Sequence, residues 1–184
     1  TGSDFALSCS SGTDALLLSM MALEIKPQDE VITTPFSFIS TAETIALLGA
    51  VPVFVDIDEQ TFNIDPYKIE EKITSKTRVI MPVSLYGQPA NMSSIQDLAD
   101  RYRLKVIVDG AQSFGSSYKG KTDSTFGDIA TTSFYPAKPL GCYGDGGAMF
   151  TNDDEIAKNL KMIANHGQEQ KYYHKITGCN SRLD

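Results

Sequence analysis

The sequence has few of the residues from which metal sites and disulfide frameworks are built. It contains two histidines and three cysteines among 184 residues. Cys9, Cys142 and Cys179 are widely spaced and include no CxxC pair, a pattern that favours reduced thiols in a cytoplasmic protein. Neither histidine stands at metal-ligand spacing with carboxylates or cysteines, so we predict no metal site.

Long apolar runs and an excess of positive charge are also missing. No run approaches the roughly 18 residues that a membrane-spanning helix needs, and residues 1–4 do not resemble a signal peptide. The chain has 16 Lys and Arg against 23 Asp and Glu, a net charge of −7 that argues against a general nucleic-acid-binding surface. A locally basic pocket for a nucleotide is compatible with this charge.

Length and apolar periodicity predict one α/β domain. The chain is long enough to bury a sizeable core, and no repeat, low-complexity tract or Gly/Ser-rich linker divides it. Apolar runs predict strands over residues 5–7, 30–33, 51–56, 78–85, 106–109, 129–135 and 147–151. Helical spacing predicts helices over residues 12–25, 40–48, 66–73 and 92–102, and one that starts at 153 and runs toward 166.

The alternation of these elements predicts a mostly parallel sheet between two layers of helices. Ser11 or Thr13 can cap the first helix, and Gly49 can end the second. In such folds ligands bind at the carboxyl ends of the strands. We therefore look for chemistry in the turns that follow the predicted strands.

Lys138 and Asp109 are the first candidates. Lys138 lies between two prolines, close to Tyr135 and just before a glycine-dense turn, and Asp109 ends an apolar strand. A lysine that can form a Schiff base and an aspartate that can face a pyridinium nitrogen are what a pyridoxal phosphate (PLP) enzyme needs. Taken singly, Lys138 is more often a solvated loop lysine, and Asp109 more often a helix cap.

The segment Ser11-Gly12-Thr13 is a candidate phosphate site. Gly12 lets the backbone approach an anion, the Ser and Thr hydroxyls can donate hydrogen bonds, and the helix that follows directs its positive end at the phosphate. A plain N-cap without a ligand is the alternative for this pattern. Phe36 or Phe38 can cover a cofactor ring by stacking, or can be ordinary core residues.

The segments Ser10–Leu16, Thr34–Phe38, Asp109–Gly115 and Ser133–Gly141 resemble motifs of the DegT/StrS sugar aminotransferases, in the same order. The closing residues Asn180–Asp184 fit that family too, so the resemblance covers essentially the whole chain. It implies the type I (aspartate aminotransferase-like) PLP-transferase fold, a three-layer α/β/α domain with a mostly parallel mixed sheet. Members of the family continue into a smaller C-terminal domain. We therefore expect residues 1–184 to be a truncated PLP-binding large domain.

The resemblance also implies roles for particular residues. Lys138 matches the catalytic lysine that carries PLP, and Asp109 matches the partner of the pyridine nitrogen. The other residues that match cofactor-binding positions are Gly12, Thr13, Phe38 (preferred to Phe36 for stacking), Gln112 on the phenolic oxygen, Ser133 on the phosphate, and Asn180, which the family's dimer partner contributes. Arg182 and Tyr135 are candidates for substrate binding, because an arginine can bind a phosphate or carboxylate in a bidentate manner.

The resemblance implies transamination of a nucleotide-linked keto-sugar, with glutamate as the expected amino donor and PMP as the aminated cofactor. Ser84–Gln88 and Pro139–Gly147 look most like enzymes that aminate carbon 3 of a UDP-2-acetamido-3-keto-hexuronate for surface polysaccharide or lipopolysaccharide biosynthesis. Lysine rather than histidine at position 138 favours transamination over the dehydration that some family members perform. A carbon-4 aminotransferase and a non-catalytic regulatory or structural domain are the alternatives. We expect a homodimer with shared active sites and no nucleic-acid or membrane partner.

Overall fold

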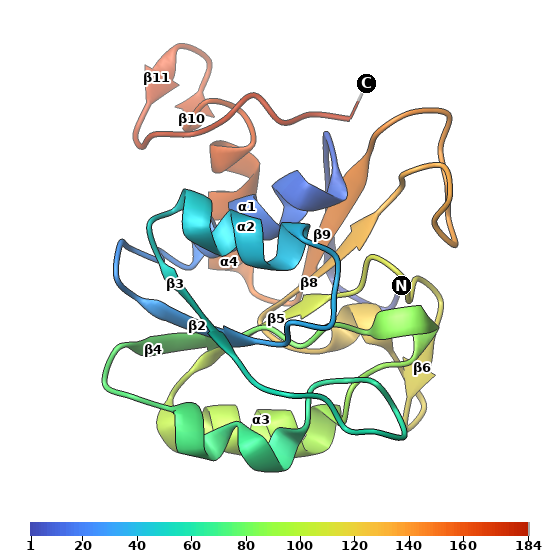
Figure 1. Cartoon of the computed structure of the whole chain (residues 1–184). Helices are drawn as coiled ribbons and strands as arrows, with labels where there is room; N and C mark the ends of the chain where they lie inside the picture. Colours follow the sequence, from blue (N-terminus) through green and yellow to red (C-terminus); the bar gives the residue numbers. More distant parts are fainter. Residues whose placement is uncertain (184) are drawn as a thin grey trace.

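The computed structural model describes residues 1–183; Asp184, which ends the C-terminal motif and the predicted domain, lies outside the described residues. Within residues 1–183, seven strands form one sheet in the order β1-β9-β8-β5-β4-β2-β3 (Figure 1). The strands span Phe5–Cys9 (β1), Glu30–Thr33 (β2), Val51–Phe54 (β3), Thr77–Ile80 (β4), Lys105–Asp109 (β5), Ile129–Ser133 (β8) and Gly147–Thr151 (β9). Strand β9 is antiparallel to both of its neighbours, and the other pairs are parallel.

This topology puts several strand ends at one edge of the sheet. Because β1 and β8 both run antiparallel to β9, they are parallel to each other and to β5. The carboxyl ends of β1, β2, β4, β5 and β8 therefore lie on the same side. The predicted mostly parallel mixed sheet is confirmed, and the turns that carry the candidate residues lead out of this edge.

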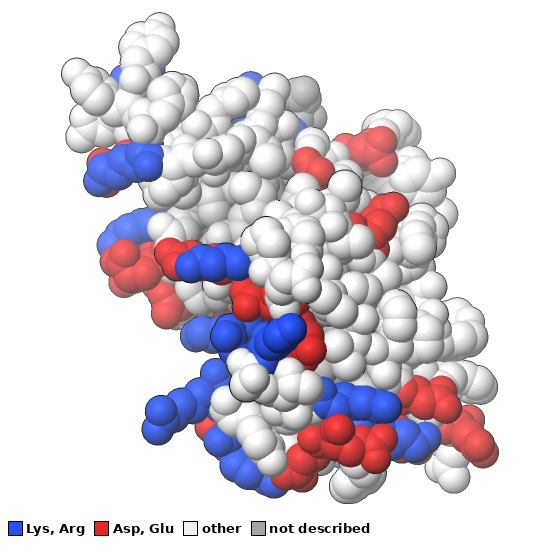
Figure 2. Space-filling model, turned by 60° about the vertical axis from the view of Figure 1, so that its left-hand side comes forward, with Lys and Arg blue, Asp and Glu red and all other residues white. Residues whose placement is uncertain are grey.

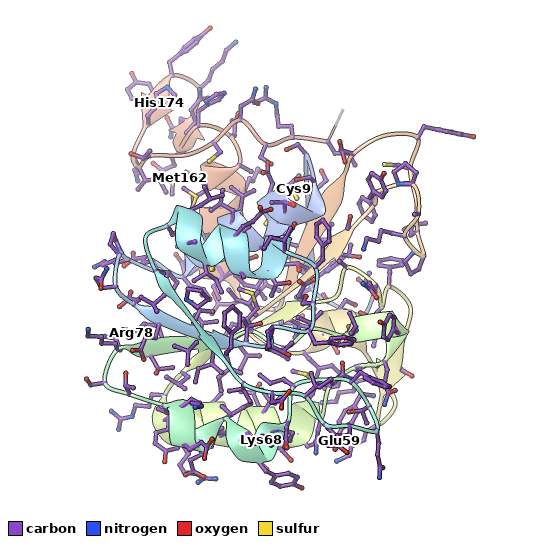
Figure 3. All side chains as sticks on the ribbon, in the orientation of Figure 1. Cys9, Glu59, Lys68, Arg78, Met162 and His174 are labelled. Atoms are coloured by element: carbon purple, nitrogen blue, oxygen red, sulfur yellow. The ribbon has the colours of Figure 1, made fainter. Side chains whose placement is uncertain are left out.

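Helices cover both faces of the sheet. Helices α1 (Gly12–Ala22), α2 (Ser40–Leu47) and α4 (Asp154–Ile163) lie on one face, and α3 (Met92–Tyr102) lies on the other (Figure 1). Side chains fill the space between the sheet and each layer (Figure 3). The predicted three-layer α/β/α architecture is confirmed.

The alternation of side chains along the strands explains why buried apolar residues pack on both faces of the sheet. In β5, Val106 and Val108 pack in the cluster that contains residues of α3, whereas Ile107 packs in the cluster with α1 and α2. In β2, Ile32 and Val31 divide in the same way. Successive residues of a strand point to opposite faces, so a strand covered on both sides reads as a continuous apolar run.

Local signals account for the helix ends. The Ser11 hydroxyl caps α1 by accepting a hydrogen bond from the Asp14 N–H at 3.0 Å. Helix α2 stops before Gly49, whose φ of +72° is the left-handed conformation that glycine adopts most easily. Helix α1 ends at Ala22 rather than at the predicted residue 25, because Glu24 already has a left-handed backbone with φ 57°.

One predicted element is wrong, and another is shorter than predicted. Residues 66–73 form two short 3-10 turns, Pro66–Lys68 and Glu70–Lys72, instead of a helix. Ile69 is the fully buried side chain in this stretch, and one apolar contact does not offset the entropy of ordering a longer helix. The strand predicted over residues 78–85 ends at Ile80, since Pro82 lacks an N–H for the ladder.

Other differences are small. Strand β3 ends at Phe54 rather than 56, and β8 ends at Ser133 rather than 135. Two hairpins were not predicted: Ser117–Tyr118 with Lys121–Thr122 (β6 and β7), and Gln168–Gln170 with Tyr173–His174 (β10 and β11). His174, labelled in Figure 3, lies on the second hairpin and is exposed. Among residues 1–183, no helix has the length and apolarity needed to cross a bilayer.

Candidate active site

A cavity of about 540 Å³ opens at the carboxyl edge of the sheet. Its size falls in the range of small-molecule and cofactor sites. The turns after β1, β2, β5 and β8 contribute most of its lining, which consists of Ser11, Gly12, Thr13, Leu16, Ser37, Phe38, Ser40, Val83, Asp109, Ala111, Gln112, Ser133, Tyr135, Ala137, Lys138 and Asp145. Nine residues that the sequence pointed to as cofactor or substrate contacts are thus brought together from distant parts of the chain.

Asp109 forms the deep part of this cavity. It ends β5, its backbone pairs with Val83, and the residue is only 5% exposed. Its Oδ2 accepts a hydrogen bond from the Thr41 hydroxyl at 2.8 Å, and its Oδ1 accepts one from the Ala111 N–H at 3.3 Å. Burial raises the pKa of the Asp109 carboxyl, while these two hydrogen bonds and the positive charge of Lys138 oppose that rise.

Lys138 lies in the loop that joins β8 to β9, and its side chain lines the same cavity as Asp109. Backbone hydrogen bonds fold the loop into turns: the Lys138 N–H donates to Tyr135 O at 2.8 Å, and the Cys142 N–H donates to Phe134 O at 2.7 Å. The Phe134 N–H donates to Gly146 O at 2.7 Å and closes the base of the loop. Lys138 is therefore held in place by a loop whose backbone is fixed by hydrogen bonds.

The predicted phosphate turn adjoins Ser133. A Cβ placed on Gly12 would lie 2.6 Å from the Ser133 Cβ, so only glycine permits this approach of α1 to the end of β8. Ser11, Thr13 and Ser133 all line the cavity beside the N-terminus of α1. An anion placed here would meet hydroxyl donors, free backbone N–H groups and the positive end of the helix dipole.

Three further predicted residues also line the cavity. The Oε1 of Gln112 accepts a hydrogen bond from the Tyr86 N–H at 2.8 Å, which leaves the Gln112 amide NH₂ as a donor for a ligand. Phe38 lines the cavity and is 67% exposed, whereas Phe36 packs against Phe62 with ring centroids 5.9 Å apart. Of the two candidate rings, Phe38 is the one at the site. Tyr135 is exposed at the cavity wall.

Asn180 and Arg182 lie outside the cavity of this chain. Asn180 is exposed and forms an isolated bridge with Asn165, and the Arg182 guanidinium donates to Asn165 Oδ1 at 3.1 Å. Ser181, between them, is fully buried. The side chains of Asn180 and Arg182 therefore point outward, while the buried Ser181 holds the segment against the domain.

Sequence reasoning missed several residues of the site. Asp145 was noted only as part of the glycine-dense turn, and Ser37, Ser40 and Val83 received no role, although all four line the cavity. The Ser40 hydroxyl is 2.8 Å from that of Thr13, which ties α2 to α1 at the cavity. The only signals were the place of Ser37 inside the aromatic motif, between Phe36 and Phe38, and that of Ser40 two residues after it.

Other reactive groups take no part in the cavity. Cys9 is fully buried, and burial raises the pKa of its thiol to about 12, so it stays protonated. Cys9, Cys142 and Cys179 are free thiols. Within residues 1–183, no cluster of three or more His, Cys, Asp and Glu side chains is placed to hold a metal ion.

The cavity fits PLP on structural grounds. One cavity of suitable size is lined by a buried carboxylate, a lysine amine and the N-terminus of α1, where Gly12 and Ser133 are in close contact. These are the groups that a pyridinium, an aldehyde and a phosphate require.

Comparison with known proteins agrees with this geometry. The family model described as the DegT/DnrJ/EryC1/StrS aminotransferase family matches residues 1–184. A UDP-2-acetamido-2-deoxy-3-oxo-D-glucuronate aminotransferase of Pseudomonas aeruginosa is 56% identical over 183 residues, which are 100% of this chain and 51% of that protein. A pleiotropic regulatory protein of Geobacillus stearothermophilus is 52% identical over 178 residues, which are 97% of this chain and 48% of that protein.

A solved structure provides the same match in three dimensions. The crystal structure of NtdA from Bacillus subtilis with bound cofactor PMP aligns with a TM-score of 0.93 at 42% identity, covering 98% of this chain and 41% of that one. The chain thus spans about half the length of the curated relatives it matches. By fold, by motif order and by the family model over residues 1–184, the chain belongs to the DegT/DnrJ/EryC1/StrS family of PLP-dependent aminotransferases.

Proposed function

We propose that this chain carries the PLP-binding half of a sugar-nucleotide aminotransferase. The observation that carries the proposal is the meeting of Lys138 and Asp109 in one cavity beside the N-terminus of α1. A domain that only binds a partner does not require a lysine amine and a buried carboxylate that line the same cavity. The family match and the PMP-bound relative support the same reading.

Each of the predicted cofactor-binding residues in the cavity would contact a different part of PLP. Asp109 would bind the pyridine nitrogen, and the Gln112 amide NH₂ would donate to the phenolic oxygen. Thr13, Ser133 and the backbone around Gly12 would bind the phosphate, and Phe38 would cover one face of the ring. When bound, PLP supplies an aldehyde that accepts the amino group and a ring that withdraws electrons from the reacting carbon.

Lys138 has two tasks in this proposal. Its Nζ would hold the cofactor through the aldehyde carbon at rest. With an amino donor bound, the free Lys138 amine would remove a proton from the donor's carbon and would later deliver one to the carbon of the acceptor sugar. Asp109, as a negative charge on the ring nitrogen, would favour the electron withdrawal that makes this proton acidic.

For the substrate we propose a UDP-linked 2-acetamido-3-keto-hexuronate, with glutamate as amino donor and surface polysaccharide or lipopolysaccharide biosynthesis as the setting. The support is the Pseudomonas aeruginosa relative, which is 56% identical across this chain and is named for such a substrate. A carbon-4 keto-sugar is the rival within the family. Tyr135 at the cavity wall and Arg182 outside it are the proposed substrate contacts.

We also propose that the active protein is a homodimer. Asn180 and Arg182 project from the surface instead of into their own cavity, so their proposed roles at the phosphate and the substrate require a second copy. A two-fold axis would give each site one Asn180 from the partner. The free cysteines are compatible with a cytoplasmic location, which is part of this proposal.

The second candidate is a regulatory domain that keeps the fold. The 52% identical relative from Geobacillus stearothermophilus carries the name of a regulatory protein, and this is the observation that favours it. The two functions differ in a measurable way, because a regulator can bind PLP without moving an amino group.

The decisive experiment combines cofactor spectroscopy with product analysis. Full-length protein loaded with PLP should show a visible absorption band from the lysine-bound cofactor, and glutamate should move that band to shorter wavelength. Lys138→Ala should lose the band and lower kcat by about 10³-fold or more. Incubation with a panel of UDP-keto-sugars and mass analysis of the product identifies the acceptor.

Different outcomes separate the candidates. A wild-type protein that binds PLP but shows no response to glutamate, and no aminated product with any sugar, supports the regulatory domain. A wild-type protein with no visible band, and a Lys138→Ala variant indistinguishable from it, overturns the enzyme proposal altogether.

A further inference from the structure

A chain of hydroxyl groups leads from the cavity wall to Asp109. The Thr41 hydroxyl donates to Asp109 Oδ2 at 2.8 Å, and the Ser37 hydroxyl lies 2.7 Å from Thr41 Oγ1. Ser37 lines the cavity, whereas Thr41 is 1% exposed and does not line it. Thr41 thus contacts the carboxylate from behind, from the first turn of α2.

The single proton of each hydroxyl fixes the direction of this chain. An ionised Asp109 can only accept, so Thr41 must give its proton to Oδ2. Thr41 can then only accept from Ser37, and the lone pairs that remain on Ser37 are available to the cavity. The direction of both bonds therefore depends on the ionised state of Asp109 and in turn stabilises it.

The other groups around Asp109 cannot replace Thr41. The Ala111 N–H reaches Oδ1 at 3.3 Å, a longer contact to the other oxygen. The charge of Lys138 favours ionisation of Asp109, and the nearby acidic group is Asp123, whose pKa the charge of Asp109 raises. Thr41 is the side chain that donates a hydrogen bond to this carboxylate among residues 1–183.

We propose that Thr41 is a positioning residue for Asp109: its hydroxyl fixes Oδ2 and stabilises the carboxylate, and Ser37 orients the Thr41 hydroxyl. This inference rests on the proposed function, because it takes Asp109 as the partner of the cofactor's ring nitrogen. Thr41 touches neither cofactor nor substrate and acts only through Asp109.

The test removes the hydroxyl while keeping the shape of the side chain. In full-length protein loaded with PLP, Thr41→Val should move the acid-side pH transition of the visible absorption band upward by about one unit, and should weaken PLP binding roughly tenfold. The upward direction follows because loss of the donor makes Asp109 easier to protonate. Thr41→Ser restores the donor and should return both values to those of the wild type.

Helix α2 offers a matched control. Thr44 is equally buried one turn later, and its hydroxyl donates to Ser40 O at 2.8 Å, with no contact to Asp109. Thr44→Val removes a buried hydroxyl from the same helix and should leave the pH transition in place. Ser37→Ala keeps the Thr41 donor but frees its orientation, so it should produce a smaller upward shift than Thr41→Val.

A second readout needs no cofactor. Carbon-13 NMR titration of the Asp109 carboxyl should show a higher pKa in Thr41→Val than in the wild type and in Thr44→Val. Equal values in all three proteins, or equal absorption transitions, overturn the proposal. A wild-type protein that binds no PLP refutes the proposed function, while the NMR comparison still decides whether Thr41 controls Asp109.

Discussion

Two buried carboxylates lie close together at the end of β5, and they differ in what surrounds them. Asp109 has a hydroxyl and an N–H on its two oxygens and faces Lys138. Asp123, 3% exposed, accepts a short hydrogen bond from Ser113 on Oδ2, and its Oδ1 has no partner within the described part of the chain. A buried carboxylate oxygen without a donor favours the neutral acid.

The pH dependence of stability should reveal this state of Asp123. Burial raises the pKa of its carboxyl, and the charge of Asp109 adds to the rise. A raised pKa in the folded state means that stability is present at acid pH and is lost as pH rises from about 4 toward the folded pKa. Asp123→Asn should remove that part of the loss and stabilise the protein at pH 7 by on the order of 1 kcal/mol. Urea unfolding between pH 4 and pH 8 measures it.

A control with the opposite sign is available. Asp58 is half-buried, and hydrogen bonds from the Thr61 N–H and hydroxyl lower the pKa of its carboxyl. Asp58→Asn should therefore lower stability at neutral pH rather than raise it. If Asp123→Asn unfolds at the same urea concentration as the wild type at every pH, Asp123 is not held as the neutral acid.

At the scale of elements, the edge of the sheet that carries the candidate residues was predictable from the sequence, whereas several exact strand ends and the contacts between elements were not. Asp109 and Lys138 could be placed at one edge because parallel strands share their carboxyl ends. Thr41 could not, since its hydroxyl gains its importance only when α2 packs against the end of β5. The prediction for residues 66–73 failed because Pro66 and the charged residues after it suit a helix start, yet Ile69 is the one fully buried apolar side chain there and Ile73 is only partly buried.

A polar cluster joins the C-terminal segment to helix α1. Asp14 Oδ2 accepts hydrogen bonds from the hydroxyls of Ser10 at 2.5 Å and Ser181 at 2.6 Å, and the Ser10 N–H donates to Ser181 Oγ at 3.1 Å. The Ser181 N–H also donates to Ala164 O at 3.0 Å. Asp14 lies in the first turn of α1, where the helix dipole favours a negative charge.

Loss of the Ser181 hydroxyl should release this segment. Ser181→Ala removes one of the two hydroxyl donors to the half-buried Asp14 carboxylate, which should cost about 1 kcal/mol of stability. Amide hydrogen exchange should become faster at residues 179–183 before it does so in the sheet. Ser75→Ala, at an exposed serine, is the matched control. Unchanged exchange at residues 179–183 would show that backbone contacts alone hold the segment.

At the scale of the whole molecule, charge and apolar surface are unevenly distributed. Charged side chains of both signs lie along the left-hand side and the lower part of the face shown in Figure 2, and a broad area toward the centre and right carries few charges. Large apolar side chains are exposed elsewhere on the chain, including Phe36, Phe38, Ile39, Leu47 and Tyr86. Such exposure is typical of surfaces that a partner covers.

Mixing two inactive variants tests whether sites are shared between copies. If Lys138 and Asn180 of one site come from different chains, a heterodimer of Lys138→Ala and Asn180→Ala contains one intact site and one doubly altered site. Equal mixing of refolded chains should then recover about a quarter of wild-type activity. Activity that stays at the level of the separate variants would mean that each site is built from one chain, or that no dimer forms.

The contact of Gly147 with the start of α1 has a consequence for how this scaffold can diversify. A Cβ at Gly147 would lie 2.4 Å from Ser11 O, just as one at Gly12 would collide with Ser133. Both ends of the Lys138 loop are thus packed closely against the N-terminus of α1. Tyr135 and Asp145, which lie between these ends, line the cavity. We expect substitutions that change the preferred sugar to occur in the middle of this loop and not at its two ends. The preference for an acceptor could then change without weakening the binding of the cofactor.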